Sequence, residues 1–330
     1  MIDTDNWKKE YFRLRATNNQ EDINKSFELK LQHLPKYLYK YREFCIEHKA
    51  RLRNELSGLI HLSKIENFND PYDSKAILKE SRRIYLELSK DHIRHEMSYY
   101  FSPEIINNVF SKENWYEKMI ALGLQKENPL SKEVAKAGDE FLDKIKKPLL
   151  NITSDFNKIL EEGIRVACFT ERYNNIPMWY HYAGRFRGYC IEYDTSHIKD
   201  TLYAKRLMPV NYVTKLREVA PDFEKYYNES YTKSIKNVID EYITTKLMDW
   251  SYENEWRLVL SIKMINELEN NVQIIKNTNG CEIMFAKPAR ILVSEKMNAQ
   301  DLLEIKKECK RFDVKMCLLE LSESGPVIKE

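Results

Sequence analysis

The segment formed by residues 250–257 carries two glutamates that are separated by a single residue. On a β-strand, residues two apart share a face, so Glu253 and Glu255 would point the same way and Arg257 would join them. Two adjacent carboxylates repel each other unless a cation or a substrate lies between them. The pair is therefore a candidate acid–base or cation-stabilising site, although a solvated strand face is the simpler interpretation. Because an amide would relieve the repulsion, we expect Glu255→Gln to leave folding nearly unchanged.

Three other segments hold polar residues that folding alone does not obviously require. They are Tyr39-Lys40-Tyr41-Arg42 on an early predicted strand, Cys168-Phe169-Thr170-Glu171 at the end of a later one, and Pro177-Met178-Trp179-Tyr180-His181-Tyr182-Ala183 on the helix that follows. Each has an interpretation without a ligand, since Arg42 would be a strand-end charge and the aromatic rings would pack in the core. A shared site would bring together one residue from each segment: Arg42, Thr170, Tyr180 and Glu255.

Composition disfavours two common nucleotide-binding folds. The 330 residues include only 8 glycines, of which none forms a Gly-x-Gly-x-x-Gly turn and none is followed by Lys. The dinucleotide fingerprint and the Walker A loop both need bare backbone next to phosphate, so neither a Rossmann dehydrogenase nor a P-loop NTPase is expected. The 53 Lys and Arg residues against 51 Asp and Glu leave a net charge of +2. Any contact with nucleic acid would therefore have to come from a local patch.

Cysteine usage and hydropathy indicate a cytoplasmic protein. The six cysteines include no Cys-x-x-Cys pair, and because metal ligands usually come in closely spaced pairs, no metal site is predicted. The charged N-terminus lacks an apolar signal segment, so we expect reduced thiols. No run of about eighteen apolar residues is present, and no membrane contact is predicted.

The hydrophobic pattern predicts an α+β fold with a mixed or antiparallel central sheet. Runs rich in β-branched and aromatic residues predict strands at 38–42, 59–65, 164–170, 188–194, 207–214, 255–262, 283–285, 290–293 and 314–319. Helical spacing predicts helices at 49–59, 174–185, 218–250 and 299–310. The central strands therefore come from both ends of the chain.

Three regions follow from this pattern. Residues 1–36 are predicted to form N-terminal helices, and residues 37–73 and 161–320 to form an α+β core that resembles a catalytic domain. Residues 74–160 are rich in lysine and carry apolar side chains at helix spacing, so they are predicted to be a large helical insertion. We interpret this insertion as a lid or as a surface that binds a partner protein.

Four ordered motifs carry a resemblance to a known family. They are Tyr-Lys-Tyr-Arg at 39–42, Asn-Asp-Pro-Tyr-Asp at 69–73, Met-Trp-x-x-Tyr-Ala at 178–183 and Tyr-Glu-x-Glu-Trp-Arg at 252–257. Together they resemble the bacterial domain of unknown function 2971 family over residues 38–293, without the helical block. The resemblance implies no established reaction. It suggests an accessory gene, such as a phage defence gene, rather than central metabolism.

A weaker resemblance, to mono-ADP-ribosyltransferases, suggests chemistry. That family places an Arg or His on its first strand, a Ser-Thr-Ser-like strand next, and a late Glu-x-Glu that enters a strand. The matching positions here are Arg42, Cys168-Phe169-Thr170 and Glu253-Asn254-Glu255, with Cys in place of the first Ser. The resemblance implies an ADP-ribosyltransferase-like fold with NAD as substrate. Such a fold binds NAD without a glycine fingerprint.

The same resemblance implies roles for individual residues. Arg42 would hold the NAD pyrophosphate, because a guanidinium fork fits phosphate oxygens. Thr170 would brace the site, and Tyr180 or Tyr182 would stack on nicotinamide. Glu255 would contact the ribose and stabilise an oxocarbenium-like transition state, with Glu253 beside it. The full set of implied NAD contacts is Tyr39, Arg42, Thr170, Trp179, Tyr180 and Tyr182.

Three functions remain open on these grounds. The first is an NAD-consuming transferase or NAD glycohydrolase that acts as a toxin or defence effector, with a nucleic acid or a protein as acceptor. The second is a metal-dependent nuclease that gathers acidic side chains around a divalent ion, namely Asp70, Asp73, Glu192, Asp194 and Glu253. The third is a non-catalytic module that binds a ligand or a partner through its aromatic strip and helical block.

Overall fold

The fold is taken from a computed structural model, and it divides into two compact units. The first comprises Met1–Lys75, Ile159–Leu216 and Thr232–Glu330, and the second comprises Ala76–Lys158 and Arg217–Tyr231. The structure describes residues 6–17, 19–74, 160–216, 239–269, 279–323 and 325–329, with short pieces at 94–95, 98, 102–111, 158 and 274–277. Most of the helical insertion predicted for 74–160 therefore lies outside the described residues, as does its predicted partner surface.

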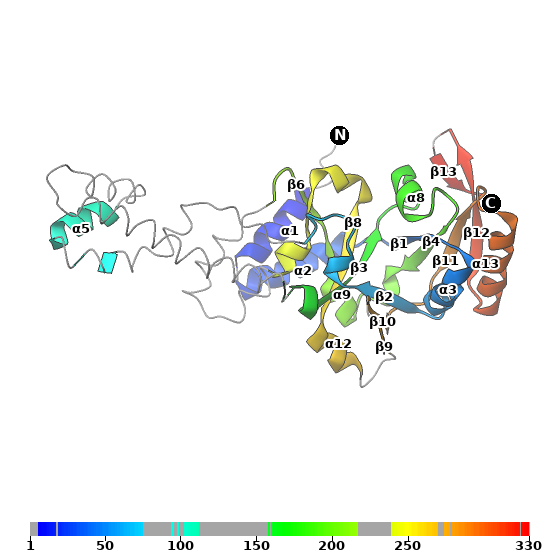
Figure 1. The fold of residues 1–330 in the computed structure, drawn as a ribbon, viewed down its shortest axis with the longest axis horizontal. Helices are drawn as coiled ribbons and strands as arrows, with labels where there is room; N and C mark the ends of the chain where they lie inside the picture. The colour runs from blue at the N-terminus through cyan, green and yellow to red at the C-terminus, as the bar shows by residue number, and fades with distance from the viewer. Residues whose placement is uncertain are drawn as a thin grey trace. The chain divides into compact units, whose positions relative to one another are not determined.

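Among the described residues, eleven strands form one sheet (Figure 1). Its order is β13 (Gly325–Ile328), β12 (Lys315–Ser322), β11 (Arg290–Ser294), β4 (Tyr189–Asp194), β1 (Tyr37–Arg42), β3 (Ile164–Thr170), β2 (Leu59–Ser63), β10 (Gly280–Met284) and β9 (Ile274–Asn277), with β8 (Glu255–Ser261) on β3 and β5 (Leu207–Pro209) on β8. The pairs are antiparallel except β11–β12, which is parallel. The predicted α+β class with a mixed, mostly antiparallel sheet is confirmed.

Helices cover this sheet, and a separate parallel pair stands beside it. The pair is β6 (Asn211–Val213) with β7 (Thr245–Leu247). The α-helices of the first unit are α1 (Asn6–Ala16), α2 (Gln20–Gln32), α3 (Lys49–Leu56), α8 (Ile176–Tyr182), α9 (Leu202–Arg206), α12 (Ile262–Glu269) and α13 (Ala299–Arg311). Short 3₁₀ turns are η1 (Ile46–His48), η2 (Ile65–Asn67), η3 (Thr195–His197) and η4 (Met248–Glu253). In the second unit, α5 (Pro103–Phe110) buries three apolar side chains.

Local capping explains where three of these helices begin. The side chains of Asn19, Asn175 and Asn298 each accept a backbone N–H from the first turn of α2, α8 and α13. An asparagine at this position satisfies donors that the helix itself leaves without a partner. The start of α8, which carries several predicted site residues, is therefore set by a short-range signal.

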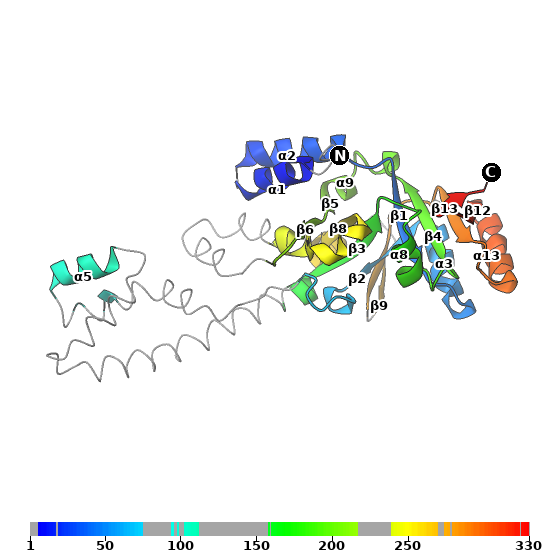
Figure 2. The same ribbon diagram turned by 90° about the horizontal axis from the view of Figure 1, so that it is seen from above.

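The alternating side chains of β1 divide the apolar core between the two faces of the sheet. Leu38 belongs to the larger cluster, which includes residues of α3 and α13. Tyr39 and Tyr41 point to the other face, where they pack with Trp179 of α8. Both views place α8 beside β1 and β4 (Figure 1, Figure 2). The aromatic strip seen in the sequence is thus partly a core contact.

Strands β1 and β3 run together only briefly. Both are fully described, and their register contains one pair, Tyr39 with Thr170. β3 instead pairs along its whole length with β8, from Ile164–Ser261 to Thr170–Glu255. The sheet therefore splits beyond Tyr39, and polar groups at the edges of β1 and β3 face each other across an opening.

Two predicted elements differ from the structure. The helix predicted for 218–250 does not continue to its expected end, because Thr245–Leu247 forms β7 and Met248–Glu253 forms η4. The strand predicted for 207–214 is two short strands, because β5 pairs with β8 whereas β6 pairs with β7. In both cases long-range pairing overrides a local pattern. Residues 217–238 of the predicted helix lie outside the described residues.

The approach of Gly188 to β1 generates a stability prediction. A Cβ at Gly188 would lie 2.0 Å from the carbonyl oxygen of Arg42. We expect Gly188→Ala to lower the free energy of unfolding by about 1–3 kcal/mol or more, because the backbone must shift. Gly163→Ala is the matched control, since a Cβ there meets nothing within 4 Å, and a change below about 1 kcal/mol is expected. Urea unfolding measures both, and equal losses would contradict the prediction.

Candidate functional site

A cavity of ≈ 420 Å³ lies where β1 and β3 separate. This volume falls within the usual range for small-molecule sites, about 300–1,000 Å³. Segments that are far apart in the sequence line it, namely Tyr39, Lys40, Tyr41 and Arg42 from β1, Ser63, Asn67, Phe68, Asn69 and Asp73 from β2 and the following loop, Val166, Cys168, Phe169 and Thr170 from β3, Met178, His181 and Tyr182 from α8, and Lys246, Glu253 and Glu255. Polar groups of both signs therefore surround one space.

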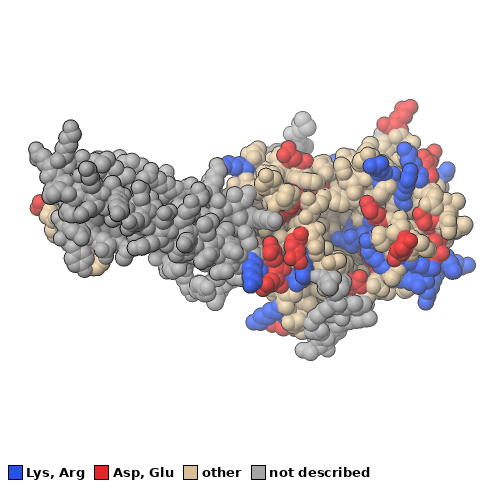
Figure 3. All heavy atoms as spheres, in the orientation of Figure 1, with Lys and Arg blue, Asp and Glu red and all other residues tan. Residues whose placement is uncertain are grey.

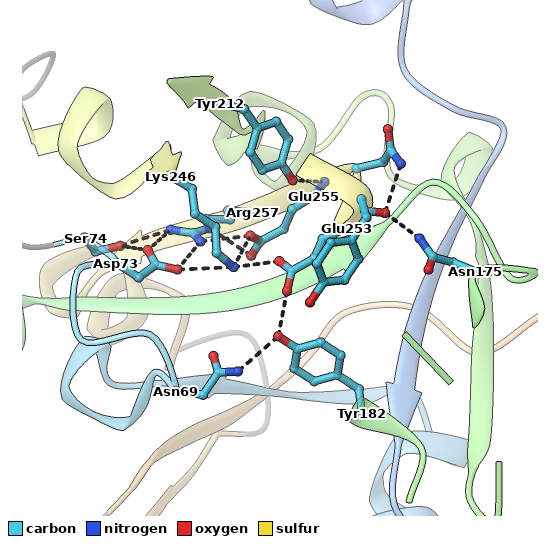
Figure 4. Close-up of polar contacts among 12 residues, drawn as sticks. Asn69, Asp73, Ser74, Asn175, Tyr182, Tyr212, Lys246, Glu253, Glu255 and Arg257 are labelled. Atoms are coloured by element: carbon cyan, nitrogen blue, oxygen red, sulfur yellow. Dashed lines mark hydrogen bonds and ion pairs between the residues drawn. The ribbon is translucent and has the colours of Figure 1, made fainter. Parts of the chain in front are cut away.

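The ammonium group of Lys246 lies between three carboxylates on one wall of the cavity (Figure 4). Its Nζ is 2.6 Å from Glu253 Oε2, 3.3 Å from Glu255 Oε2 and 3.4 Å from Asp73 Oδ2. All four side chains are buried. The cation expected between the two glutamates is thus supplied by the protein itself.

Arg257 is the second cation of this charge cluster. Its guanidinium donates to both carboxylate oxygens of Asp73, at 2.7 and 2.6 Å, and to both of Glu255, at 2.9 Å each. It also donates to Ser74 Oγ at 3.0 Å and to the carbonyl of Ile243 at 2.5 Å. The side chain is fully buried. Arg257 therefore ties the loop after β2, which contains Asp73 and Ser74, to β8 and to the chain just before β7.

The two glutamates reach Lys246 by a route that differs from the predicted one. Glu253 is not on the strand, because it ends η4, and only Glu255 begins β8. Asn254 between them has φ 44° and ψ 55°, a left-handed conformation that asparagine tolerates better than most residues. The turn brings both carboxylates to one cation. Glu255 and Arg257 do share a face of β8, as predicted.

The environment separates the proton affinities of the two glutamates. Burial alone would raise the pKa of Glu255, but Arg257 and Lys246 hold that pKa at about 2. Burial, together with the charge of Glu255, raises the pKa of Glu253 above its usual value, although Lys246 opposes this. Glu255 is therefore firmly ionised at neutral pH. Glu253 is the carboxylate better suited to exchange a proton.

A chain of hydrogen bonds links Glu253 to α8 and to the loop after β2 (Figure 4). The hydroxyl of Tyr182 donates to Glu253 Oε1 at 2.6 Å, and Asn69 Nδ2 donates to the Tyr182 oxygen at 3.1 Å. Asn175, the residue that caps α8, also donates to the carbonyl of Tyr252 in η4. Burial and the Glu253 charge raise the pKa of Tyr182, so this hydroxyl keeps its proton.

The β1 wall of the cavity is basic. Lys40 Nζ donates to the carbonyl of Cys168 at 2.8 Å, across the opening between β1 and β3. Burial, and next the charge of Arg42, lower the pKa of Lys40 to about 7. Arg42 Nε donates to Glu55 Oε1 at 2.6 Å. Its Nη2 is buried without a hydrogen-bond partner among the described residues, which is costly for a charged donor unless a ligand satisfies it.

The structure brings most of the predicted site residues together. Glu253, Glu255, Arg42, Thr170, Tyr39 and Tyr182 all line the cavity. Trp179 and Tyr180 are not among the residues that line it, so the cavity lends their predicted ligand contacts no support. Trp179 is fully buried and donates to the carbonyl of Tyr173, whereas Tyr180 is 49% exposed on the outer face of α8. One helix turns Tyr182 inward and Tyr180 outward because its side chains are spread around 3.6 residues per turn.

The acids of the nuclease hypothesis do not gather in one place. Glu192 accepts two hydrogen bonds from Arg290, and Asp194 accepts the backbone N–H of Ser196. Neither lines the cavity, and Asp70 does not either. Asp73 and Glu253 do line it, but Lys246 stands between them.

Sequence reasoning missed Lys246, the residue at the centre of the acidic wall. Its position fell inside the helix predicted for 218–250, where a lysine reads as one more solvated charge. The structure instead places it on β7, where only 3% of the residue is exposed. No local pattern revealed this, because the turn that brings Glu253 and Glu255 back to Lys246 and the approach of the distant Asp73 are both features of the folded chain.

Comparison with protein families supports two of the four motifs, those at 178–183 and 252–257. Residues 178–258 match the family model described as protein of unknown function (DUF2971). This segment belongs to the DUF2971 family. The match contains Lys246, Glu253, Glu255 and Arg257, so the charged wall, apart from Asp73, lies inside the DUF2971 segment. Comparisons with curated proteins and with solved structures gave no match.

Within the part of the chain that the structure describes, no helix combines the length and apolar character needed to cross a membrane. The helices of the first unit instead bury one face against the sheet, as α13 does through Ile305 and Cys309.

The position of Lys246 predicts a large, pH-dependent loss of stability on its removal. Lys246→Met leaves the buried carboxylates of the cluster with one cation, Arg257, so we expect the free energy of unfolding at pH 7 to fall by about 3–5 kcal/mol. Without Lys246 the pKa of Glu253 rises further above its unfolded value. The folded variant then binds a proton that the unfolded chain does not, so part of the loss should be recovered as the pH falls from 7 to 5.

Urea unfolding at both pH values measures this effect, with two controls. Lys246→Arg keeps the charge and should lose less. Lys64→Met removes one partner of an exposed pair with Glu66 and should cost about 0–1 kcal/mol. A Lys246→Met variant as stable as Lys64→Met at pH 7 would contradict the bridging role.

The lowered pKa of Lys40 predicts a stability change on the alkaline side. The pKa of Lys40 is about 7 in the folded protein and about 10.4 in the unfolded chain. Below pH 7 the buried charge lowers the free energy of unfolding by its full amount, and this loss disappears as the pH rises from about 7 to about 10.4. We expect wild-type stability to increase between pH 7 and 9, with a smaller slope in Lys40→Met. Lys30, whose pKa is also lowered to about 7 by burial, should account for the remaining slope. Equal slopes for wild type and Lys40→Met would show that Lys40 stays charged.

Proposed function

We propose that this protein is an NAD-consuming enzyme of the ADP-ribosyltransferase type. The observation that carries the proposal is the arrangement of three sequence segments around one cavity. Arg42 on β1, Thr170 on β3 and Glu255 at the start of β8 lie on three neighbouring strands and line the same space. This is the order in which the transferase resemblance places its basic, hydroxyl and acidic residues. An ADP-ribosyltransferase-like fold for the sheet is part of the same proposal.

Charge polarity of the cavity supports NAD as the substrate. On the acidic wall three carboxylates face two cations, Lys246 and Arg257, which leaves one net negative charge when all are ionised. The β1 wall offers Lys40 and Arg42. NAD carries a positive nicotinamide ring and a negative pyrophosphate, so opposed walls of this kind would orient it. Arg42 Nη2, which is buried and has no hydrogen-bond partner among the described residues, would donate to a phosphate oxygen after a small turn of the guanidinium toward the cavity.

The two glutamates would then take different parts in the reaction. As the bond between nicotinamide and ribose breaks, positive charge develops on the ribose, and the ionised Glu255 would stabilise it. Glu253, whose pKa is raised by burial, would accept the proton of the attacking acceptor or water. Tyr182, which lines the cavity and donates to Glu253, would stack on the nicotinamide. Thr170 accepts the backbone N–H of Arg172 and so braces the end of β3.

Such an activity suits a cytoplasmic toxin or an anti-phage defence effector, since consuming NAD or modifying a macromolecule arrests a cell. The acceptor would be a nucleic acid or a protein. The four ordered motifs of the DUF2971 resemblance, which also suggest an accessory gene, motivate this part of the proposal. No metal is required, because the cations of the site are protein side chains.

Nicotinamide release from NAD by the purified chain tests the proposal. We expect release that persists in EDTA and falls about a hundredfold or more in Glu253→Gln, a size typical for loss of an acid–base group. Glu253→Gln is the informative variant because Asp73 and Glu255 still balance Lys246 and Arg257, so folding should hold. Glu255→Gln is less informative, since it removes the carboxylate charge that pairs with the buried Arg257. Because of these contacts we expect Glu255→Gln to destabilise the fold, in place of the neutral effect expected from the sequence alone.

Matched variants separate chemistry from folding and binding. Glu282→Gln changes another carboxylate whose pKa is raised by burial but which lies outside the cavity, and it should keep full activity. Arg42→Lys keeps the charge but removes the guanidinium fork, so it should raise KM more than it lowers kcat. Absence of nicotinamide release from the folded wild type with candidate acceptors present, or equal release by Glu253→Gln, would defeat the proposal.

A further inference from the structure

The outer surface of α8 and its flanking turns carries a local excess of positive charge. Residues 172–187 contain three arginines and no Asp or Glu. Arg172, Arg185 and Arg187 are all exposed, and none forms an ion pair with a described residue. In Figure 3, Lys and Arg side chains gather around the position that α8 occupies in Figure 1. The chain as a whole is nearly neutral, so this excess is a property of one patch.

Apolar and aromatic groups are exposed among these charges. Ile176 is 53% exposed and Tyr180 is 49% exposed, although residues of their size are normally buried. The guanidinium of Arg185 lies 5.5 Å from the centroid of the Tyr180 ring. An exposed ring with a cation beside it is a surface on which a planar, negatively charged partner can stack.

The turn after α8 holds this arrangement in place. Gly184, Arg185 and Phe186 have φ values of 54°, 56° and 69°, so two non-glycine residues adopt the left-handed conformation in succession. Such residues are costly and persist where surrounding contacts enforce them. Here the N–H groups of Arg185 and Phe186 donate to the carbonyls of Tyr180 and Trp179. The position of Arg185 over Tyr180 is therefore built into the fold.

Neighbouring charges do not cancel the patch. Glu43 packs against Gly184, and Lys296 lies 5.8 Å from the ring centroid of Phe186. These two charges are opposite in sign, and Glu171, which precedes Arg172, lies 3.8 Å from Lys8 Nζ, so these neighbours leave the three arginines in excess. The α8 surface also adjoins the cavity, because Met178, His181 and Tyr182 of the same helix line it.

We propose that the α8 surface, formed by Arg172, Ile176, Tyr180, Arg185 and Arg187, binds single-stranded nucleic acid. Phosphates would pair with the arginines and a base would stack on Tyr180. A duplex fits less well, because its bases are stacked internally and cannot reach the ring. The proposal deepens the transferase proposal by naming the acceptor class, since a strand bound here would pass the mouth of the cavity.

Fluorescence anisotropy with labelled oligouridylate and oligothymidylate of about twenty nucleotides tests the surface, and NAD is left out so that catalysis plays no part. We expect Arg172→Ala, Arg185→Ala and Arg187→Ala combined to weaken binding at least tenfold. Each phosphate contact contributes roughly 0.7 to the steepness of log affinity against log salt for a single strand. Loss of three such contacts should therefore reduce that steepness by about 2. Tyr180→Ala should weaken binding about tenfold, whereas Tyr180→Phe should not.

Matched controls isolate the surface from charge in general. Lys306, Lys307 and Lys310 are exposed on α13, and replacing all three by Ala removes the same charge but should change affinity less than twofold. Equal weakening in both triple variants would overturn the proposal. So would tighter binding of polyglutamate or of vesicles with anionic lipid than of either oligonucleotide, because the partner would then be an acidic protein or a membrane.

The outcome is independent of the NAD reaction. Nucleic-acid binding that depends on Tyr180 without any nicotinamide release would uphold the α8 surface and defeat the transferase proposal. The opposite result is nicotinamide release together with oligonucleotide binding that is the same in the Tyr180 variants and the wild type. It would uphold the transferase proposal and defeat the α8 surface.

Discussion

The buried guanidinium of Arg257 is the interaction on which the rest of the site depends. A charged group removed from water is tolerated only when partners satisfy its donors. Arg257 obtains these partners from Asp73 and Ser74 in the loop after β2, from the chain before β7 and from Glu255 on its own strand. Three segments are thereby held together beneath the cavity. The carboxylates that Arg257 attracts are the same ones that give the cavity its acidic wall.

The split between β1 and β3 converts this charge cluster into a site. If β1 and β3 had stayed paired along their length, backbone hydrogen bonds would join their edges and leave no space between them. Because the strands separate beyond Tyr39 and Thr170, the opening is bordered by Lys40 and Arg42 on one side and by the acids on the other. Two walls of opposite charge in a partly buried space create a directed field, which favours a ligand with charges of both signs.

The sequence predicted the sheet well where side chains carry a strong local pattern. The strand at 164–170 has the predicted bounds, and the strands containing Arg42 and Glu255 were found to within one residue. These strands are buried runs of β-branched and aromatic residues, whose period is visible without any partner. Lys246 and the short strand β7 were missed because a three-residue strand has no period of its own. Its conformation follows from pairing with β6 and from the ion pairs of Lys246 with the nearby Glu253 and Glu255 and the distant Asp73.

Residue type and spacing alone singled out the candidate groups: an early arginine, a strand-end threonine and a Glu-x-Glu before a tryptophan. Tertiary structure alone decided how these groups are arranged around the cavity. Whether Tyr180 or Tyr182 faces the cavity depends on the rotation of α8, which packing of Trp179 beneath it sets. Whether the two glutamates repel each other depends on Lys246 and Arg257. The cluster also needs Asp73, which is far from these residues in the chain, and free energies of burial and charge pairing exist only once folding has brought the groups together.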